Sequence, residues 1–430
     1  MYKDEIISFL YKYGFILKNN FHKDIKSLYD YGHYGVLLNN NLKNIWSYYY
    51  LIYNNIYFID TNILTTNLLL NRSKHIKNFN KYILYNIKND KFYKIDRLKY
   101  LKYLLIKYYY LIKYLLKNNK LKKINLLFIK LNIHYYILNI NLMFSIKSLN
   151  NIYYLRPEIS QKVYINYFDI INKYKCKPPF GILQIGKSFR KEIFNKEKFF
   201  RMYEFEQMEM QYFVINNIKY YFKFWLQQRI KWYKMLNIYN IKIVKNTKLP
   251  HYALYSKDIL FKINNVYKEI EGIHIRNDLN NFYIKKKNPY IIETSLGLNR
   301  LFYLIIINNL IKRKQKYILK IPFCISPIKC AFLPLIKYKS IIIFSYKIYH
   351  IIKYKYNCVY KDKKSIGKRY LLQDSIGTPF CITIDYITLY NKKITLRFRD
   401  NKLQKRICIC RIYKYLKHTT INYFFKKNNL

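Results

Sequence analysis

Two stretches decide the fold: SFRKE at residues 188–192 and, after a short loop, RMYEF at residues 201–205. Each combines an aromatic side chain with arginine and glutamate. The pattern predicts two antiparallel strands joined by the loop between them. Taken alone, these residues also fit an ordinary charged hairpin.

A third stretch, ETSLGLNR at residues 293–300, has the order strand, glycine turn and arginine, and residues 301–310 continue with a helical pattern. Arg300 would therefore stand at the start of a helix, where the backbone N–H groups favour anions. A guanidinium group also binds phosphate oxygens in a bidentate manner. The alternative is a strand–turn–helix unit with a surface arginine.

Glutamate is unevenly distributed, because nine of the ten glutamates lie between residues 158 and 293. The nine are Glu158, Glu192, Glu197, Glu204, Glu206, Glu209, Glu269, Glu271 and Glu293. Five arginines are interleaved with them or flank them: Arg156, Arg190, Arg201, Arg276 and Arg300. Carboxylates and arginines placed together suit a site that holds a cationic amine, divalent metals and a triphosphate. Local salt bridges on helices are the alternative.

Glycine is rare, and eight of the nine glycines fall in stretches that carry motif residues. The eight are Gly32, Gly35, Gly181, Gly186, Gly272, Gly297, Gly367 and Gly377. Glycine is required where the backbone adopts positive φ or approaches a ligand closely. Its retention there marks these stretches as important in a chain biased toward Lys, Asn, Ile and Tyr.

The chain is strongly basic, with a formal net charge of +56 over 430 residues. Such a charge favours a polyanionic partner, first a nucleic acid and second an anionic membrane surface. The same lysine bias occurs in stretches without motifs, as an A+T-rich genome would produce. Function and codon usage are therefore equally good explanations for the bulk of the charge.

The seven cysteines form no CxxC pair, which argues against a zinc ribbon or a thioredoxin-type site. Their odd number and scattered spacing favour reduced thiols in a cytosol-like compartment. Residues 1–10 contain acidic side chains and lack the apolar core of a secretory signal. Four lysines interrupt the most apolar stretch, residues 98–116, so no membrane span is expected. We expect a cytoplasmic protein.

The first two thirds of the chain contain two patterns. Residues 36–156 lack Gly and Pro, and the segment at about 90–150 is rich in Leu, Ile, Lys and Tyr with helical spacing. This predicts a helical insertion. Residues 153–307 alternate strand-like runs, such as 180–185, 205–213 and 290–293, with turns and a helix near residues 217–233. This indicates an α+β domain built on a sheet.

A second domain follows a break near residues 312–321, where Pro322 begins a new pattern. Strands and helices alternate from there, which predicts a small α/β domain. Its last two strands, at 380–385 and 393–398, are expected to be joined by a turn at 390–392.

Residues 188–205 resemble motif 2 of class II aminoacyl-tRNA synthetases, and residues 293–300 resemble motif 3. The surrounding stretches resemble the α2-type glycyl-tRNA synthetase family along nearly the whole chain. The matching stretches are residues 29–36, 155–161, 179–190, 204–209, 251–253, 269–273, 365–370 and 373–380. The resemblance implies an antiparallel-sheet catalytic domain at 1–311, with the insertion at about 90–150, and an anticodon-binding domain at 321–430. It also implies a homodimer.

The resemblance further implies ATP-dependent attachment of glycine to tRNA(Gly) through a glycyl-adenylate. Arg190, Arg201 and Arg300 would neutralise phosphate charge and act as catalytic residues, while Glu192 would accept from the adenine amino group and Phe205 would stack on the ring. The implied ATP-binding residues are Arg190, Lys191, Glu192, Phe200, Arg201, Phe205, Glu269, Ile270, Gly297 and Arg300. Glu269, together with the backbone of Ile270, would stand beside ATP and its Mg²⁺ ions.

For glycine, the resemblance implies a pocket in which carboxylates bind the α-ammonium group and leave no room for a larger side chain. Every competitor is larger than glycine, so exclusion gives specificity. The implied glycine-binding residues are Lys94, Glu158, Glu206, Gln207, Glu209, Arg276, Glu293, Thr294 and Ser295.

Some positions depart from the family pattern. Asn67 replaces the proline of motif 1, which forms the dimer interface in this class, and Lys74 replaces the glycine of a Ser-Gly-His sequence. Lys94 stands where the family has an arginine. None of these changes removes a charged catalytic group.

Two other functions remain open at this stage. A non-catalytic relative, such as the accessory subunit of mitochondrial DNA polymerase, would keep the fold and bind nucleic acid. It is opposed by the presence of Arg190, Glu192, Arg201, Glu209, Glu293 and Arg300. A class II synthetase for another amino acid is opposed by the three-carboxylate pocket.

Overall fold

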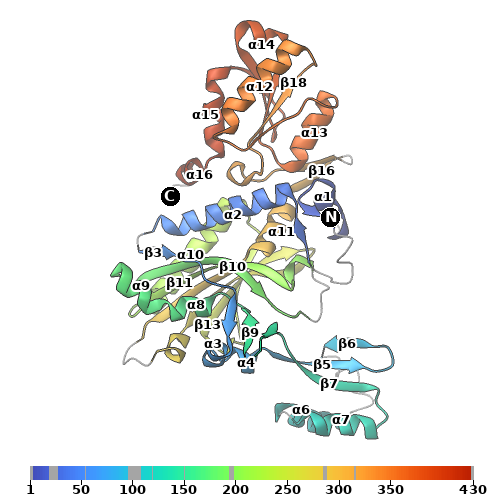
Figure 1. Cartoon of the computed structure of the whole chain (residues 1–430), viewed down its shortest axis with the longest axis vertical. Helices are drawn as coiled ribbons and strands as arrows, with labels where there is room; N and C mark the ends of the chain where they lie inside the picture. The colour runs from blue at the N-terminus through green and yellow to red at the C-terminus, as the bar shows by residue number, and fades with distance from the viewer. Residues whose placement is uncertain are drawn as a thin grey trace.

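The computed structural model describes residues 3–18, 28–53, 55–94, 108–118, 120–149, 151–192, 198–283, 288–313 and 316–427. Within these residues a large sheet carries helices on both faces (Figure 1). A smaller sheet-and-helix unit projects from its lower end, and an α/β unit made by the C-terminal part of the chain stands above it.

The large sheet has seven strands in the order β12-β13-β14-β15-β11-β10-β3. Their bounds are β3 (Ile56–Phe58), β10 (Phe180–Phe189), β11 (Glu204–Val214), β12 (Ile241–Lys245), β13 (Ala253–Ile263), β14 (Val266–Arg276) and β15 (Tyr290–Gly297). Neighbouring strands are antiparallel apart from the parallel pair of β10 and β3. The three predicted strands lie within β10, β11 and β15, so those predictions are confirmed.

The two faces of this sheet differ because successive side chains on a strand point to opposite sides. On β11, Met208 and Met210 are buried in the main core beneath three helices. These are α2 (His33–Leu51), α10 (Ile218–Met235), which was the predicted helix, and α11 (Leu298–Asn309). Gln207 and Glu209 point to the opposite face. Helices α8 (Ser160–Ile165) and α9 (Tyr167–Tyr174) cover part of that face.

Short elements surround the sheet. They are α1 (Lys3–Lys12), β1 (Ile16–Leu17), β2 (Asp30–Tyr31), α3 (Asn67–Arg72), α4 (His75–Asn78) and the 3₁₀ turns η3 (Lys198–Phe200) and η4 (Asp278–Asn281). A three-stranded sheet is formed by β4 (Leu64–Thr66), β9 (Ile152–Leu155) and β8 (Ser145–Lys147).

The insertion is only partly helical, which corrects the prediction. Helices α6 (Tyr109–Lys117) and α7 (Leu121–Lys130) pack on a three-stranded sheet of β5 (Asn80–Asn86), β6 (Lys91–Lys94) and β7 (Tyr135–Asn141). Residues 95–107 lie outside the described part. The strand β7 was missed because its apolar positions, such as Ile137, recur at a spacing that short helices also show.

The C-terminal unit has a five-stranded sheet in the order β19-β18-β20-β21-β22. The strands are β18 (Cys330–Pro334), β19 (Cys358–Tyr360), β20 (Phe380–Ile384), β21 (Lys393–Phe398) and β22 (Gln404–Cys408). The helices are α12 (Lys339–Lys353), α13 (Ile366–Ile376), α14 (Tyr386–Asn391), α15 (Ile412–Leu416) and α16 (Ile421–Lys427), with 3₁₀ turns η5 (Phe323–Ile325), η6 (Ile409–Arg411) and η7 (Lys417–Thr419). The expected turn at 390–392 is replaced by α14, which Asp385 begins with a capping box.

The C-terminal unit is attached to the large sheet through a hairpin and a helix. The hairpin is formed by β16 (Leu310–Arg313) and β17 (Lys316–Leu319), where a break was expected. Helix α16 buries Phe425 beside Tyr48 and Tyr49 of α2. The Asn41 side-chain amide of α2 also donates to the carbonyl oxygens of Ile325 and Ser326.

All seven cysteines are free thiols, and Cys176, Cys324, Cys330 and Cys381 are buried. Among the described helices, none combines the length and apolarity that crossing a bilayer requires.

Two helical glycines give opposite expectations for stability. A Cβ at Gly35 of α2 would lie 2.0 Å from the carbonyl oxygen of Phe15, whereas a Cβ at Gly367 of α13 would meet nothing within 4 Å. We expect Gly35→Ala to lower the free energy of unfolding by about 1–3 kcal/mol or more through overpacking. Gly367→Ala should raise it by up to about 1 kcal/mol, because alanine favours the helix. Denaturant unfolding followed by circular dichroism measures both, and equal effects of the two substitutions would contradict the close contact at Gly35.

Candidate active site

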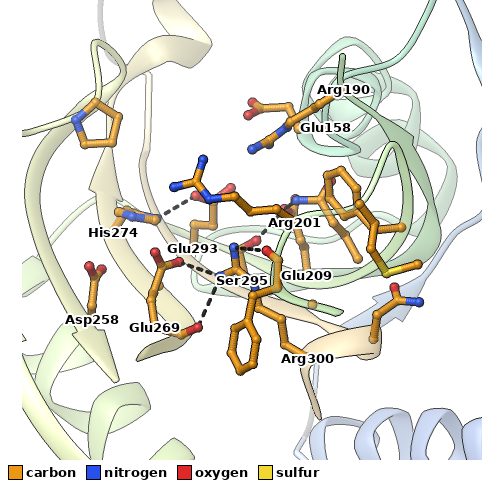
Figure 2. Close-up of a pocket in the computed structure, with 18 of the residues that line it drawn as sticks. Glu158, Arg190, Arg201, Glu209, Asp258, Glu269, His274, Glu293, Ser295 and Arg300 are labelled. Atoms are coloured by element: carbon orange, nitrogen blue, oxygen red, sulfur yellow. Dashed lines mark hydrogen bonds and ion pairs between the residues drawn. The ribbon is translucent and has the colours of Figure 1, made fainter. Parts of the chain in front are cut away.

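A cavity of about 270 Å³ opens on the polar face of the large sheet, across β11, β15, β14 and β13 (Figure 2). Thirteen of the residues singled out from the sequence line it. They are Glu158, Arg190, Glu192, Phe200, Arg201, Phe205, Gln207, Glu209, Glu269, Glu293, Ser295, Gly297 and Arg300. Residues from four separate stretches of the chain are thus brought to one place by the strand order.

One end of the cavity is lined by three buried carboxylates, those of Glu158, Glu209 and Glu293. Antiparallel register aligns Glu209 on β11 with Ser295 on β15, whose hydroxyl donates to Glu209 Oε1 at 2.6 Å. The Gln211 amide donates to Glu209 Oε2 at 3.3 Å and to Glu293 Oε1 at 2.8 Å. These bonds hold the two carboxylates in fixed positions.

Arg276 lies behind this end of the cavity and is 1% exposed. Its guanidinium group donates to Glu293 Oε1 at 2.7 Å and to Asp278 Oδ2 at 2.6 Å, and it lies 3.7 Å from Glu158 Oε1. The ring of Tyr252 stacks on the group, with its centroid 3.9 Å from Cζ. Arg276 therefore compensates several buried negative charges at once, without itself lining the cavity.

Glu158 is held from the opposite side by a network around α4 and α8. Its Oε1 accepts from the Ser160 hydroxyl at 2.7 Å, lies 3.1 Å from His75 Nε2, and is in close contact with the Gln161 amide. The His75 ring is fully buried and its Nδ1 contacts Ser73. Lys74, which replaces a family glycine, adopts φ +61°, a conformation that glycine adopts without strain.

The three carboxylates differ in acidity. Burial would raise the pKa of Glu158, but the His75 and Arg276 groups outweigh burial and hold that pKa well below its usual range. Burial also opposes ionisation of Glu293, and Arg276 and His274 still lower its pKa. Burial, reinforced by the charges of Glu293 and Glu158, raises the pKa of Glu209 well above its usual value. Of the three groups Glu209 therefore ionises least readily, and a bound cation would favour its ionisation.

Arginines and aromatic rings also line the cavity, and Arg190 lies close to Glu158 (Figure 2). Arg190 Nε donates to the Pro157 carbonyl oxygen at 2.9 Å, and its Cζ lies 5.2 Å from the centroid of Phe205. Arg300 Nη1 lies 3.1 Å from Glu269 Oε1, and Arg201 Nη1 lies 3.4 Å from Glu192 Oε2. Guanidinium groups beside an aromatic ring suit a nucleoside polyphosphate.

Two predicted glycine contacts are wrong because those side chains point to the helical face. Thr294 stands between the cavity residues Glu293 and Ser295 in sequence, but its hydroxyl bonds to the Tyr50 hydroxyl at 2.7 Å on the helical face. The Glu206 carboxylate pairs with Lys43 of α2. Strand alternation explains both outcomes, since each follows or precedes a cavity residue by one position.

Three further predicted contacts have different outcomes. The Lys191 side chain lies over the ring of Phe144, 5.5 Å from its centroid, and does not line the cavity. The Ile270 side chain is buried in the main core, and the expected contact of its backbone with ATP stays a prediction. A bulge between β13 and β14 places both Ile270 and Glu271 on the helical face and turns Glu269 into the cavity. The side chain of Lys94 lies outside the described part of the chain.

The sequence reasoning missed cavity residues on β13 and β14, notably Asp258 and His274. Burial, followed by the charge of Glu269, raises the pKa of Asp258. His274 Nδ1 lies 2.9 Å from Glu293 Oε2. Period-two alternation from Gly272 to Arg276 would have placed His274 on the polar face.

Comparison with known proteins places this geometry in a class. The fold matches a crystal structure described as the RNA binding domain of threonyl-tRNA synthetase from Cryptosporidium parvum Iowa II. The TM-score is 0.69 with 12% sequence identity, over 97% of this chain and 98% of that one. Residues 349–419 match a family model described as an anticodon binding domain. The fold and the site define a class II aminoacyl-tRNA synthetase.

Relatives specify the family within that class. The chain is 32% identical to the glycine–tRNA ligase of Borrelia hermsii (strain HS1 / DAH) over 98% of both proteins. It is 32% identical to that of Malacoplasma penetrans (strain HF-2) over 95% of both, and 37% identical to that of Chlorobaculum tepidum over 61% of both. The chain belongs to the glycine–tRNA ligase family.

The depressed pKa of Glu158 gives a pH-dependent expectation. A carboxylate with a lowered folded-state pKa stabilises the fold above its unfolded pKa, near the ordinary 4.5, and this contribution disappears as pH falls through the folded-state pKa. Glu158→Gln should therefore cost about 1.5–3 kcal/mol at pH 7, the usual contribution of hydrogen bonds to a charged group. The difference from the wild type should shrink as the pH is lowered below 4.5.

The control is Glu204→Gln, which removes an exposed ion pair with Lys187. It should change stability by less than about 1 kcal/mol, because solvent screens such pairs. Urea unfolding between pH 7 and pH 3 measures both variants. A Glu158→Gln deficit that grows toward acidic pH would show that the sign is wrong.

Proposed function

We propose that this protein attaches glycine to tRNA(Gly) at the expense of ATP, through a glycyl-adenylate intermediate. The observation that carries the proposal is the composition of the cavity: three buried carboxylates line it together with Arg190, Arg201 and Arg300. Membership of the glycine–tRNA ligase family supports the same activity.

Glycine binds by its ammonium group at the carboxylate end. Glu209 and Glu293 approach from neighbouring strands β11 and β15, and Glu158 from the segment before α8. An ammonium group placed among them favours ionisation of Glu209, so binding and charge neutralisation are coupled. A larger amino acid would drive its side chain into buried groups that cannot move away, which gives specificity by exclusion.

ATP binds along the three arginines. Phe205 stacks on the adenine, Glu192 accepts from its amino group, and Arg190 bridges the α-phosphate and the glycine carboxylate. Arg201 and Arg300 neutralise the remaining phosphate charge. The glycine carboxylate then attacks the α-phosphorus in line and releases pyrophosphate, so catalysis consists mainly of positioning and charge stabilisation.

The cavity also fits Mg²⁺ held jointly by protein and nucleotide. Glu269 presents a half-exposed carboxylate beside Arg300, and oxygen ligands are those that Mg²⁺ prefers. Among the described residues no group of three or more His, Cys, Asp or Glu side chains could hold a metal. This agrees with the usual arrangement, in which one or two carboxylates and the substrate phosphates bind Mg²⁺. The ion would supply charge neutralisation to the triphosphate.

In the second step the terminal ribose hydroxyl of tRNA attacks the adenylate carbonyl. We assign the catalytic domain to residues 1–311, with the insertion at about 90–150, and the domain that reads the anticodon to residues 321–430. The net charge of +56 suits the tRNA backbone. The free cysteines suit the reducing cytoplasm.

We also propose a homodimer that uses the face around α3 and β4. Leu64 and Leu68 are 51% and 65% exposed there, beside a cavity of about 380 Å³ that includes Ile165. Exposed apolar clusters of this kind mark protein–protein contacts. By resemblance, this is the motif 1 region, although Asn67 replaces its proline.

Leu68→Asp should therefore dissociate the dimer, because an ionised carboxylate would be buried at the interface. The matched control is Leu403→Asp, since Leu403 is 64% exposed in the C-terminal unit. Sedimentation velocity at micromolar concentration distinguishes the two. A wild-type monomer, or equal behaviour of the two variants, would contradict this interface.

The activity is tested by ATP–pyrophosphate exchange with each of the twenty amino acids. We expect exchange with glycine alone, loss of exchange in Glu293→Ala, and a decrease of about 10²–10³-fold in kcat for Arg300→Ala, the usual effect of removing one charge-stabilising donor. Both variants should remain folded by circular dichroism. A folded wild-type protein that exchanges with no amino acid would instead indicate the non-catalytic, nucleic-acid-binding relative.

A further inference from the structure

The two oxygens of the Glu293 carboxylate have different partners. Oε1 accepts from Arg276 Nη1 at 2.7 Å and from Gln211 Nε2 at 2.8 Å. Oε2 contacts His274 Nδ1 at 2.9 Å. Since a carboxylate oxygen accepts two good hydrogen bonds, Oε1 is saturated and Oε2 retains capacity for one more donor.

His274 approaches this oxygen from the cavity side. Arg276, Gln211 and His274 all bond to Glu293 from the polar face of the sheet, but of the three only His274 is among the residues that line the cavity (Figure 2). Oε2 is therefore the oxygen that meets a ligand in the cavity, and His274 determines its direction.

The His274 ring is itself held in place. A Cβ at residue 272 would lie 2.7 Å from His274 Cε1, so Gly272 provides the space in which the ring lies. The ring of Tyr252 stands perpendicular to it at a centroid distance of 5.9 Å. With Nδ1 facing a carboxylate at 2.9 Å, the ring must carry a proton on Nδ1 and donate it.

We propose that His274 is a positioning residue for glycine: its Nδ1–H group fixes Glu293 Oε2 in the direction required by the substrate ammonium group. The inference rests on the proposed function and extends it to a further residue of β14, the strand that also supplies Arg276. Its effect is exerted through Glu293, so it concerns glycine and leaves ATP binding unaltered.

Two substitutions separate the Nδ1 donor from the ring. In His274→Asn the side-chain amide nitrogen falls near the position of Nδ1, so the bond to Glu293 is kept. In His274→Gln the amide is one carbon further out, near the position of Nε2, so the bond is lost at similar volume. Both variants are neutral and polar, which makes each the control of the other.

Steady-state ATP–pyrophosphate exchange is measured for both, with glycine and ATP varied separately. We expect His274→Gln to raise the KM for glycine about 10–100-fold, the range that follows from losing one hydrogen bond to a charged group. The KM for ATP should stay within about twofold of the wild-type value. His274→Asn should restore the KM for glycine to within a few-fold of wild type.

Other results would overturn the inference. An unchanged KM for glycine in His274→Gln would show that the contact is not used. Equal losses in the Asn and Gln variants, or a parallel rise in the KM for ATP, would show that the ring has a structural role instead. Failure of the wild-type protein to exchange with glycine would refute the proposed function itself, which is a different result.

A third variant tests the contact without altering either partner, and it stands in for His274→Gln if that protein folds poorly. Gly272→Ala should displace the ring, because the new Cβ would lie 2.7 Å from Cε1. We expect a rise in the KM for glycine similar to that in His274→Gln. An unchanged KM for glycine in folded Gly272→Ala would contradict the proposal.

Discussion

Three carboxylates buried on one face of a sheet repel one another, and the Arg276 guanidinium is what makes that arrangement stable. It bonds to Glu293 and Asp278, approaches Glu158 and stacks on the ring of Tyr252. Buried charges are tolerated only when they are paired and hydrogen-bonded. The glycine pocket depends on this single buried cation, although Arg276 does not itself line the cavity.

The surrounding polar groups orient the three carboxylates through hydrogen bonds. Gln211 links Glu209 to Glu293, Ser295 donates to Glu209, and His75 and Gln161 hold Glu158. The carboxylates are consequently unequal, with the pKa of Glu209 raised and the others lowered. A pocket in which one carboxyl group ionises less readily limits the electrostatic cost of the free state and still offers negative charge to a bound ammonium group.

The large sheet packs against the core helices with one face and lines the cavity with the other, because side chains alternate along its strands. Met208, Thr294 and Glu271 face the helices, where Thr294 bonds to Tyr50 and Glu271 pairs with Arg229. Their neighbours in sequence face the cavity, apart from Ile270, which the bulge places on the helical face with Glu271. Helix α2 connects the sheet to the C-terminal unit, since Tyr49 contacts Phe425 and the adjacent Tyr50 bonds to Thr294 of β15. The site is therefore supported by the same core to which the C-terminal unit is attached.

The sequence by itself determined the class of fold, the glutamate- and arginine-rich composition of the site, and thirteen of its lining residues, because short motifs fix local strand and turn geometry. It could not decide which side chains reach the cavity. The β13–β14 bulge directs Glu269 into the cavity and Ile270 into the core. Strand alternation directs Glu206 and Thr294 away from the cavity, and β14 contributes His274 to it. Register and bulges arise from pairing between distant strands, so only the tertiary structure settles them.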